Sequence, residues 1–266
     1  MAKVKTPLEI YKFLPQTNCR QCHLPSCLAF AAAVLKGEKN LTDCPFVSAT
    51  VAAQFEGPVE ERTSMDRNME EVYVRLRQEI AATDLADRAA ATGGRMDGRR
   101  LVVTCLGKDF VIDQDGTVSS DCHINPWVTV PLLQYVLHSE GAAPTGEWVS
   151  MRELDGGPTW NPLFVQRCEM GLKRLADAQP QLFEDLVGMF SGRKAAPVFD
   201  ADIAIILSPL PKVPVLICYW RAEDDLESRL SIYFDRNADR NLDVELLHTL
   251  GVGMVSMFAK IGHTHA

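Results

Sequence analysis

Four of the eight cysteines lie within the first 44 residues, and their spacing limits what this part of the chain can form. Cys19, Cys22, Cys27 and Cys44 follow the pattern C-x2-C-x4-C-x16-C. A C-x2-C pair supplies two thiolates from one tight turn, and iron–sulfur clusters are held by four converging thiolates. In a reducing compartment, cysteines are more often metal ligands or buried thiols than disulfides. The spacing therefore predicts a metal centre in which these four thiols are the ligands.

A helix is predicted on each side of the cysteine loop. Thr6 and Pro7 are typical first residues of a helix, Glu9 completes a capping box, and Pro15 ends the segment. The second helix is expected to start after Ser26 and to stop at Gly37. Its apolar stripe is expected at positions i, i+3, i+4 and i+7. These positions are Leu28, Ala31, Ala32 and Leu35.

The second helix explains two of the cysteine intervals. Cys27 would occupy its first position, where the positive end of the helix dipole favours a thiolate and a negatively charged cluster. Cys44 would return to the same place after the helix and one short loop. The intervals are therefore those expected of a chain that folds back around one cluster.

Two other metal centres use part of this pattern. The letters from Cys19 to His23 also spell C-x-x-C-H, the attachment motif of c-type haem. That interpretation leaves Cys27 and Cys44 unused and requires export, for which the N-terminus shows no apolar signal segment. Structural zinc usually takes two close cysteine pairs, whereas here a helix separates the last two cysteines. Both alternatives stay open, and the iron–sulfur interpretation is favoured.

The stretch LEIYKFLPQTNCRQCHLPSCLAFAAAVLKGEKNLTDCPF resembles the small [4Fe-4S] module at the N-terminus of the corrinoid iron–sulfur protein large subunit of anaerobes. The likeness covers about residues 7–47, and related modules occur in electron-transport complex subunits. The chain departs from the family pattern at Arg20 and His23, where glycine is common. The resemblance implies a [4Fe-4S] cluster whose ligands are Cys19, Cys22, Cys27 and Cys44.

The rest of the chain predicts an α+β fold, in which the small helical module precedes a mixed α/β globular domain. The expected division is a cluster module over residues 1–60, a helical connector over 61–98 and an α+β domain over 99–266. One long polar helix is predicted at about 65–91, ending at Gly93-Gly94. Residues from about 100 to 262 are similar to an uncharacterised domain that accompanies such modules in anaerobic microbes, which implies no known reaction.

Within the last domain, alternation and apolar runs predict strands and helices. Strands are expected within residues 99–119, 146–154, 201–210, 213–220 and 229–235, and helices within 129–141, 161–178, 180–190 and 243–262.

Net charge and hydropathy limit the classes of partner that the protein is expected to bind. The formal net charge is −8 and no segment is rich in Lys and Arg, which disfavours nucleic acid because neutralising phosphates needs clustered positive charge. No run approaches the eighteen apolar residues of a membrane span. Without an export signal, the expected compartment is the cytoplasm.

Four further cysteines lie outside the module. Cys122 and His123 form a candidate second metal site, although an isolated Cys-His pair is more often incidental. Cys105, Cys168 and Cys218 are expected to be core residues.

Three other patterns could indicate binding sites, but we favour an ordinary structural explanation for each. His263 and His265 near the C-terminal end can chelate metal but are typical of a frayed tail. The stretch after Asp235 departs from a calcium loop, since its sixth position is Arg240 instead of glycine. Aromatic residues that could line a planar-ligand pocket are more simply explained by packing. They are Trp148, Trp160, Tyr219 and Trp220.

The functional prediction is a [4Fe-4S] protein that transfers single electrons in anaerobic metabolism, with a redox partner protein. A corrinoid protein as partner, and a link to one-carbon chemistry, follow from the resemblance alone. One alternative is a redox enzyme whose C-terminal domain binds a substrate or a second cofactor. Another is a binding or assembly module whose cluster is structural or senses oxygen.

Overall fold

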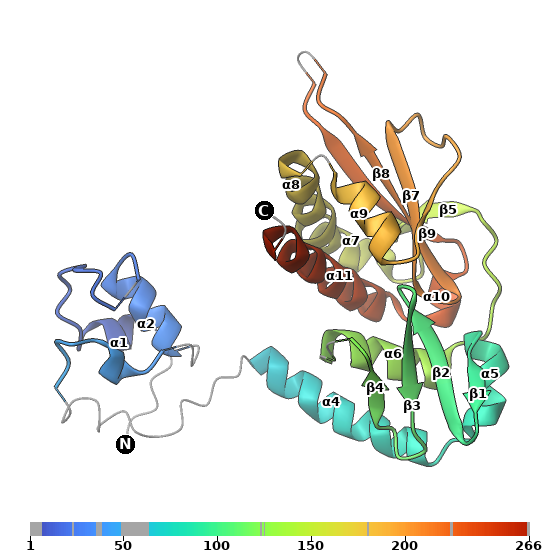
Figure 1. Ribbon diagram of the computed structural model, residues 1–266, viewed down its shortest axis with the longest axis horizontal. Helices are drawn as coiled ribbons and strands as arrows, with labels where there is room; N and C mark the ends of the chain where they lie inside the picture. Colours follow the sequence, from blue (N-terminus) through green and yellow to red (C-terminus); the bar gives the residue numbers. More distant parts are fainter. Residues whose placement is uncertain are drawn as a thin grey trace. The chain divides into compact units, whose positions relative to one another are not determined.

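The structure, a computed structural model, describes residues 7–22, 24–35, 39–48, 64–122, 124, 126–179, 181–223 and 226–264. The chain divides into two compact units, Met1–Glu70 and Glu71–Ala266, each described here by itself. Helices and antiparallel sheets occur together, so the predicted α+β class is confirmed (Figure 1). No helix among these residues is both long and apolar enough to cross a membrane.

Between residues 7 and 48, the described part of the first unit contains three short helical elements: α1 (Pro7–Tyr11), α2 (Cys27–Leu35) and the 3-10 turn η1 (Leu41–Asp43). Helix α2 begins where predicted, because the Ser26 hydroxyl accepts a hydrogen bond from the Ala29 amide at 3.1 Å. The predicted cap Thr6 and the predicted stop Gly37 lie outside the described residues.

The predicted apolar stripe of α2 was right at Ala31 and wrong at Leu28. Leu28 is 46% exposed, whereas Cys27, Phe30, Ala31 and Val34 are buried. Nearly every residue of this helix is apolar, so the sequence pattern does not select one stripe. Packing of the core buries the face of α2 that contains Cys27, Phe30, Ala31 and Val34.

The predicted single helix at 65–91 is two helices, α4 (Ser64–Ala81) and α5 (Leu85–Thr92). The Asp84 carboxylate accepts a hydrogen bond from the Ala86 amide at 2.9 Å and so starts a new helix. Gly93 ends α5 with a φ of 66°, in the left-handed conformation that favours glycine. The polar pattern of this segment concealed the interruption.

A four-stranded antiparallel sheet follows α5, with strands in chain order. Its strands are β1 (Arg95–Asp97), β2 (Arg100–Cys105), β3 (Lys108–Ile112) and β4 (Val118–Ser120). Helix α6 (Pro126–His138) comes next and packs on α5; it begins three residues before the predicted start at 129.

The second sheet has five antiparallel strands in the order β5-β9-β8-β7-β6. They are β5 (Trp148–Ser150), β6 (Arg193–Lys194), β7 (Ile203–Leu210), β8 (Val213–Trp220) and β9 (Arg229–Asp235). The central strand β8 is buried on both faces, which accounts for its nearly continuous apolar sequence.

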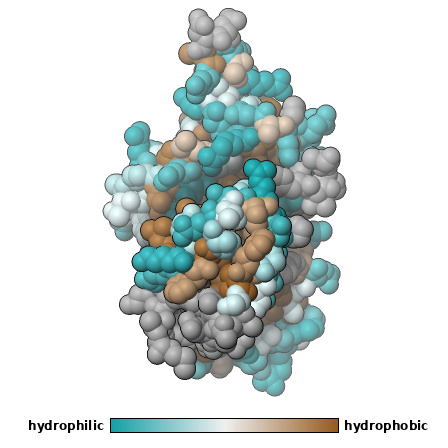
Figure 2. All heavy atoms as spheres, turned by 90° about the vertical axis from the view of Figure 1, so that its left-hand side faces the viewer, coloured by the Kyte–Doolittle hydropathy of each residue, from teal (hydrophilic) through white to brown (hydrophobic). Residues whose placement is uncertain are grey.

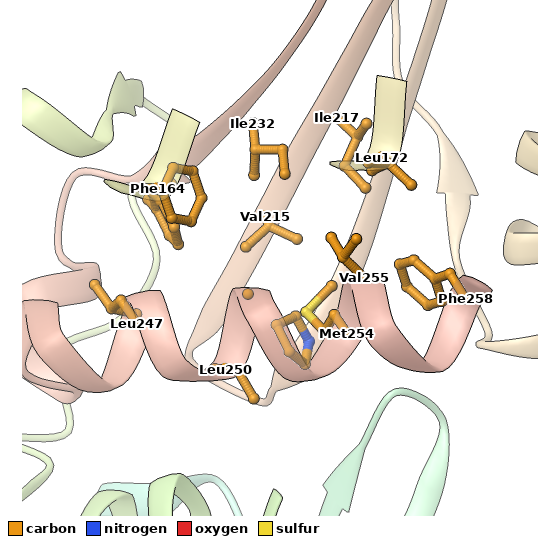
Figure 3. Close-up of a pocket in the computed structure, with 13 residues that line it drawn as sticks. Phe164, Leu172, Val215, Ile217, Ile232, Leu247, Leu250, Met254, Val255 and Phe258 are labelled. Atoms are coloured by element: carbon orange, nitrogen blue, oxygen red, sulfur yellow. The ribbon is translucent and has the colours of Figure 1, made fainter. Parts of the chain in front are cut away.

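Helices cover one face of this sheet. The 3-10 turn η2 (Met151–Glu153) is followed by α7 (Gly157–Phe164), a π-helical segment η3 (Val165–Glu169), α8 (Met170–Ala178) and α9 (Leu182–Met189). Two further helices, α10 (Ala238–Asn241) and α11 (Val244–Thr264), follow β9. Figure 3 shows side chains of α11 pointing at Val215, Ile217 and Ile232 on the strands. They surround a void of about 20 Å³ that is lined almost entirely by apolar atoms.

The other face of the sheet is covered by the segment between β6 and β7. Cys218, Ile206 and Leu216 are buried there beneath residues that include Trp148 and Trp220. Phe199 stacks on Tyr233 with ring centroids 4.5 Å apart. Phe199 and its neighbour Asp200 both have positive φ, which side chains rarely adopt.

The two sheets of the second unit are joined where the turn between β2 and β3 meets β7. The Leu106 amide, in the turn between β2 and β3, donates to the Ser208 carbonyl of β7 at 2.9 Å. A buried asparagine connects other segments of this unit, because the Asn241 amide group donates to the Ala142 and Lys212 carbonyls at 2.8 and 3.1 Å. Its oxygen accepts from the Ser139 hydroxyl at 2.9 Å.

The outer edge of β9 is protected by a carboxylate. Glu169, the last residue of the π-helical segment, accepts a hydrogen bond from the Ile232 amide at 2.8 Å. Beside it, β5 pairs with residues of β9 as far as Tyr233. Burial raises the pKa of Glu169 above the ordinary value of 4.5, although the Ile232 amide opposes this shift.

We expect Asn241→Ala to lower the free energy of unfolding by about 3 kcal/mol, because it leaves several buried polar groups without partners. Urea denaturation followed by circular dichroism measures this change. The matched control is Asn237→Ala, which removes an exposed hydrogen bond to the Ala143 carbonyl and should cost far less. Equal losses in the two variants would contradict the role given to Asn241.

We expect Glu169→Gln to stabilise the protein increasingly as the pH rises. The raised pKa means that folding takes up a proton above pH 4.5, so ionisation of Glu169 at higher pH lowers the free energy of unfolding. The glutamine keeps an oxygen for the Ile232 amide and cannot ionise. Urea denaturation from pH 4.5 to about pH 7 should show a widening gap between the two proteins. The matched control is Glu184→Gln, which changes an exposed carboxylate in the same way and should give no such gain in stability.

Candidate metal centre

Three of the four predicted ligands lie in one small core. Cys22, Cys27 and Cys44 are 8%, 6% and 5% exposed and belong to the same buried cluster. Its other members are Ile10, Leu14, Phe30, Ala31, Val34 and Leu41. Cys19, the fourth, is exposed. The fold therefore brings together thiols from the loop, from the start of α2 and from the end of η1.

The loop between α1 and α2 has an unusual backbone. Gln16, Asn18 and Arg20 have φ values of 56°, 50° and 62°, so every second residue is in the left-handed region. Arg20 follows the first cysteine, at a position where the resembling family commonly has glycine. It adopts the positive φ that a glycine would supply without a side-chain penalty. His23, the other departure from the family pattern, lies outside the described residues.

Two side chains organise the N-terminus of α2. The Ser26 hydroxyl accepts from the Ala29 amide, and the Asn18 side-chain oxygen accepts from the Cys27 amide at 2.8 Å. Cys27 is thereby held at the first helical position, as the sequence predicted. The positive end of the helix dipole lies where a cluster with a net negative charge would be stabilised.

Cys44 is placed by the turn that precedes it. The Asp43 carboxylate accepts from the Asn40 amide at 2.9 Å, and the Cys44 amide donates to the Leu41 carbonyl at 3.3 Å. These bonds close the 3-10 turn η1 and end it at the cysteine. Leu41 is buried beside Cys44 in the same core.

The chemistry of this donor set fits an iron–sulfur cluster. Four thiols, and no carboxylate, come from one loop, one helix start and one turn, and three of them face an apolar core. Among the described residues, no three His, Cys, Asp or Glu side chains form a group that could hold a single metal ion. In an iron–sulfur cluster the thiolates bind different iron atoms, so they need not meet at one metal ion. Cys19, Cys22, Cys27 and Cys44 would hold the cluster.

The remaining cysteines do not converge on a second centre. Cys105 lies on β2, Cys168 in the π-helical segment and Cys218 on β8, and all three are buried. Burial raises the pKa of Cys168 to about 12 and that of Cys218 to about 11, and it also raises the pKa of Cys105. Such thiols are protonated near neutral pH and behave as core residues.

The second candidate site is only partly described. Cys122 is half-buried, and its amide donates to the Ser120 hydroxyl at 3.3 Å. His123 lies outside the described residues, as does His265, and nothing is described of the His263 side chain. The Cys122-His123 pair therefore stays a prediction.

The four aromatic residues singled out in the sequence do not form one pocket. Trp148 and Trp220 pack over the same outer face of the five-stranded sheet. Trp160 packs on His248, with ring centroids 5.2 Å apart, and Tyr219 packs on Phe183. His248 was not anticipated, and burial lowers its pKa because the charged imidazolium loses its water.

The acidic residues near Asp235 serve the fold. Asp235 is fully buried and accepts hydrogen bonds from the Gly146 and Asn237 amides at 2.7 and 3.0 Å. Asp239 accepts from the Asp155 amide at 2.9 Å. These side chains anchor neighbouring loops, which agrees with rejecting a calcium loop.

A polar hollow of about 360 Å³ lies at the β8–β9 hairpin. At its centre the Asp177 carboxylate accepts from the Tyr219 and Ser228 hydroxyls, each at 2.7 Å, and pairs with Lys173 at 2.9 Å. This carboxylate is already engaged by three donors, so it serves first to tie α8 to the hairpin.

We expect a thiol-specific alkylating reagent to separate the cysteines of the apo-protein. Cys19 and Cys122 should react in the folded state, since both reach solvent. Cys105, Cys168 and Cys218 should react only on unfolding, because burial blocks access and raises their pKa. Peptide mapping by mass spectrometry measures the order. Rapid labelling of Cys105 or Cys218 in folded protein would contradict these positions.

Comparison with known proteins matches two parts of the chain. A family model described as "Domain of unknown function (DUF3786)" matches residues 84–257, more than half of the chain. A second family model, described as "Putative Fe-S cluster", matches residues 14–46. No solved structure matches the chain.

Several curated relatives match over a short stretch. Identity is 51% over 43 residues with acetyl-CoA decarbonylase/synthase complex subunit gamma 2 of Methanosarcina mazei, covering 16% of this chain and 9% of the relative. It is 54% over 43 residues with the corrinoid/iron-sulfur protein large subunit of Moorella thermoacetica, covering 16% and 10%. The chain therefore spans about a tenth of the length of these relatives. It belongs to the DUF3786 family and carries, before that domain, an Fe-S cluster region homologous to those of the gamma and corrinoid/iron-sulfur large subunits.

Proposed function

We propose that the first unit binds one [4Fe-4S] cluster through Cys19, Cys22, Cys27 and Cys44, and that the protein uses it to transfer single electrons. The observation that carries this proposal is the shared core of Cys22, Cys27 and Cys44, with Cys19 at the surface. When bound, such a cluster supplies a one-electron redox centre whose potential depends on nearby charge, hydrogen bonds and solvent exposure.

The protein surroundings suit a cluster that exchanges electrons with another protein. Exposed Cys19 would leave one corner of the cluster near the surface, which keeps the distance to a docked partner short. Leu28 and Phe46 each lie within two residues of a proposed ligand and are 46% and 55% exposed. Figure 2 shows apolar surface in brown among hydrophilic surface in teal on the face that it draws. Contiguous exposed apolar surface marks protein contact sites, and we propose that these two side chains contribute to such a surface.

A redox partner protein is therefore part of the proposal. The named relatives are subunits of an acetyl-CoA decarbonylase/synthase complex and of a corrinoid/iron-sulfur protein. A link of this chain to corrinoid or one-carbon chemistry in anaerobes rests on those names. We also propose that the chain is organised as a cluster module at 1–60, a helical connector at 61–98 and an α+β domain at 99–266.

Anaerobic reconstitution with iron and sulfide should give about four irons per chain and a broad visible absorption that bleaches with dithionite. Replacing any one of Cys19, Cys22, Cys27 or Cys44 by serine should sharply reduce iron content, because serine cannot supply the thiolate. Cys122→Ser is the matched control and should load like the wild type. Zinc or haem recovered from anaerobically purified protein would overturn the cluster assignment, as would loss of iron from Cys122→Ser alone.

A further inference from the structure

One hydrogen bond connects two of the proposed ligand segments. The side-chain oxygen of Asn18 accepts from the backbone amide of Cys27, at 2.8 Å and across nine residues of sequence. Asn18 directly precedes Cys19, and Cys27 is the first residue of α2. The bond therefore closes the loop that contains Cys19 and Cys22 onto the helix that begins with Cys27.

Capping of α2 does not by itself explain Asn18. Ser26 already occupies the usual capping position and accepts from the Ala29 amide at 3.1 Å. A local cap such as Ser26 belongs to the helix that it stabilises. Asn18 comes from outside the helix, so its bond fixes the loop relative to the helix as well as satisfying the Cys27 amide.

Backbone conformation offers a competing explanation that can be tested. Asn18 has a φ of 50°, and asparagine tolerates the left-handed region better than most residues. If only this conformation mattered, glycine would serve at least as well. If the side-chain oxygen matters, glycine would keep the loop conformation and lose the connection.

We propose that Asn18 is a positioning residue of the cluster site, which holds the Cys19–Cys22 loop against the start of α2 and so controls cluster retention and reduction potential. This inference rests on the proposed function. Holding the two segments together before the cluster binds reduces the conformational freedom that binding must remove. Asn18 lies one residue from a ligand, so a charge at this position would act directly on the cluster.

Two substitutions separate these effects. Asn18→Gly keeps access to positive φ but removes the acceptor, and we expect it to lose iron to a chelator about tenfold faster than the wild type, the scale of one lost hydrogen bond. Asn18→Asp keeps an acceptor and adds negative charge. It should retain the cluster at close to the wild-type rate but have a more negative midpoint potential, because added negative charge disfavours the reduced cluster.

Ser26→Ala is the matched control. It also removes one hydrogen bond from the first turn of α2, but it leaves the loop tied to the helix. We expect a lower helix stability by circular dichroism, a midpoint potential equal to that of the wild type and a smaller effect on iron loss than that of Asn18→Gly. Equal iron loss in Ser26→Ala and Asn18→Gly would reduce Asn18 to a helix cap and overturn the inference.

A measurement without the cluster keeps this inference separate from the proposed function. In the apo-protein, hydrogen exchange of the Cys27 amide should be faster in Asn18→Gly than in the wild type, because the amide loses its acceptor. Unchanged exchange would overturn the connection whether or not a cluster binds. If Asn18→Gly keeps its cluster and potential while the wild type loads four irons, the inference fails and the proposed function stands. If the wild type takes up no cluster, the proposed function fails.

Discussion

The N-terminal unit depends on a core that is too small to be stable from apolar burial alone. The nine buried members of its core all lie between Ile10 and Cys44, and three of them are cysteines. Domains of this size usually need a metal, disulfides or a partner to fold stably. A cluster that binds these thiols would therefore stabilise the unit as well as serve its chemistry. The loop, the start of α2 and the turn η1 all meet at this core.

The second unit is held together differently, by a sheet that is covered on both faces and by polar side chains that bind main-chain groups. Strand β8 places Val215 and Ile217 toward α11, and Leu216 and Cys218 toward the opposite face. Glu169 protects the Ile232 amide at the edge of the sheet, and Asn241 connects segments far apart in sequence. Cys105, Cys168 and Cys218 occupy the space of small apolar residues in this unit, which explains why these three thiols are buried without converging.

Local patterns predicted most of the elements. Alternation and apolar runs placed β7, β8, β9 and the long helix α11, because each is an apolar or amphipathic segment that can be recognised from its own residues. The sequence pattern did not predict the break between two helices within 65–91, because Asp84 interrupts a uniformly polar segment. It also did not predict the buried face of α2, because almost every residue of that helix is apolar. Asn18 was missed because its partner lies nine residues away; an asparagine directly before a ligand cysteine was the available signal.

The sequence by itself predicted the four-thiol donor set and determined the helix that begins at Cys27, since cysteine spacing and capping residues act over a few positions. Only the tertiary structure decided which of these four thiols are buried and that Cys19 is exposed. It alone decided that Arg20 adopts the glycine-like conformation and that Asn18 reaches the Cys27 amide. The physical reason is that burial and loop closure depend on contacts between segments, which no local period or propensity records.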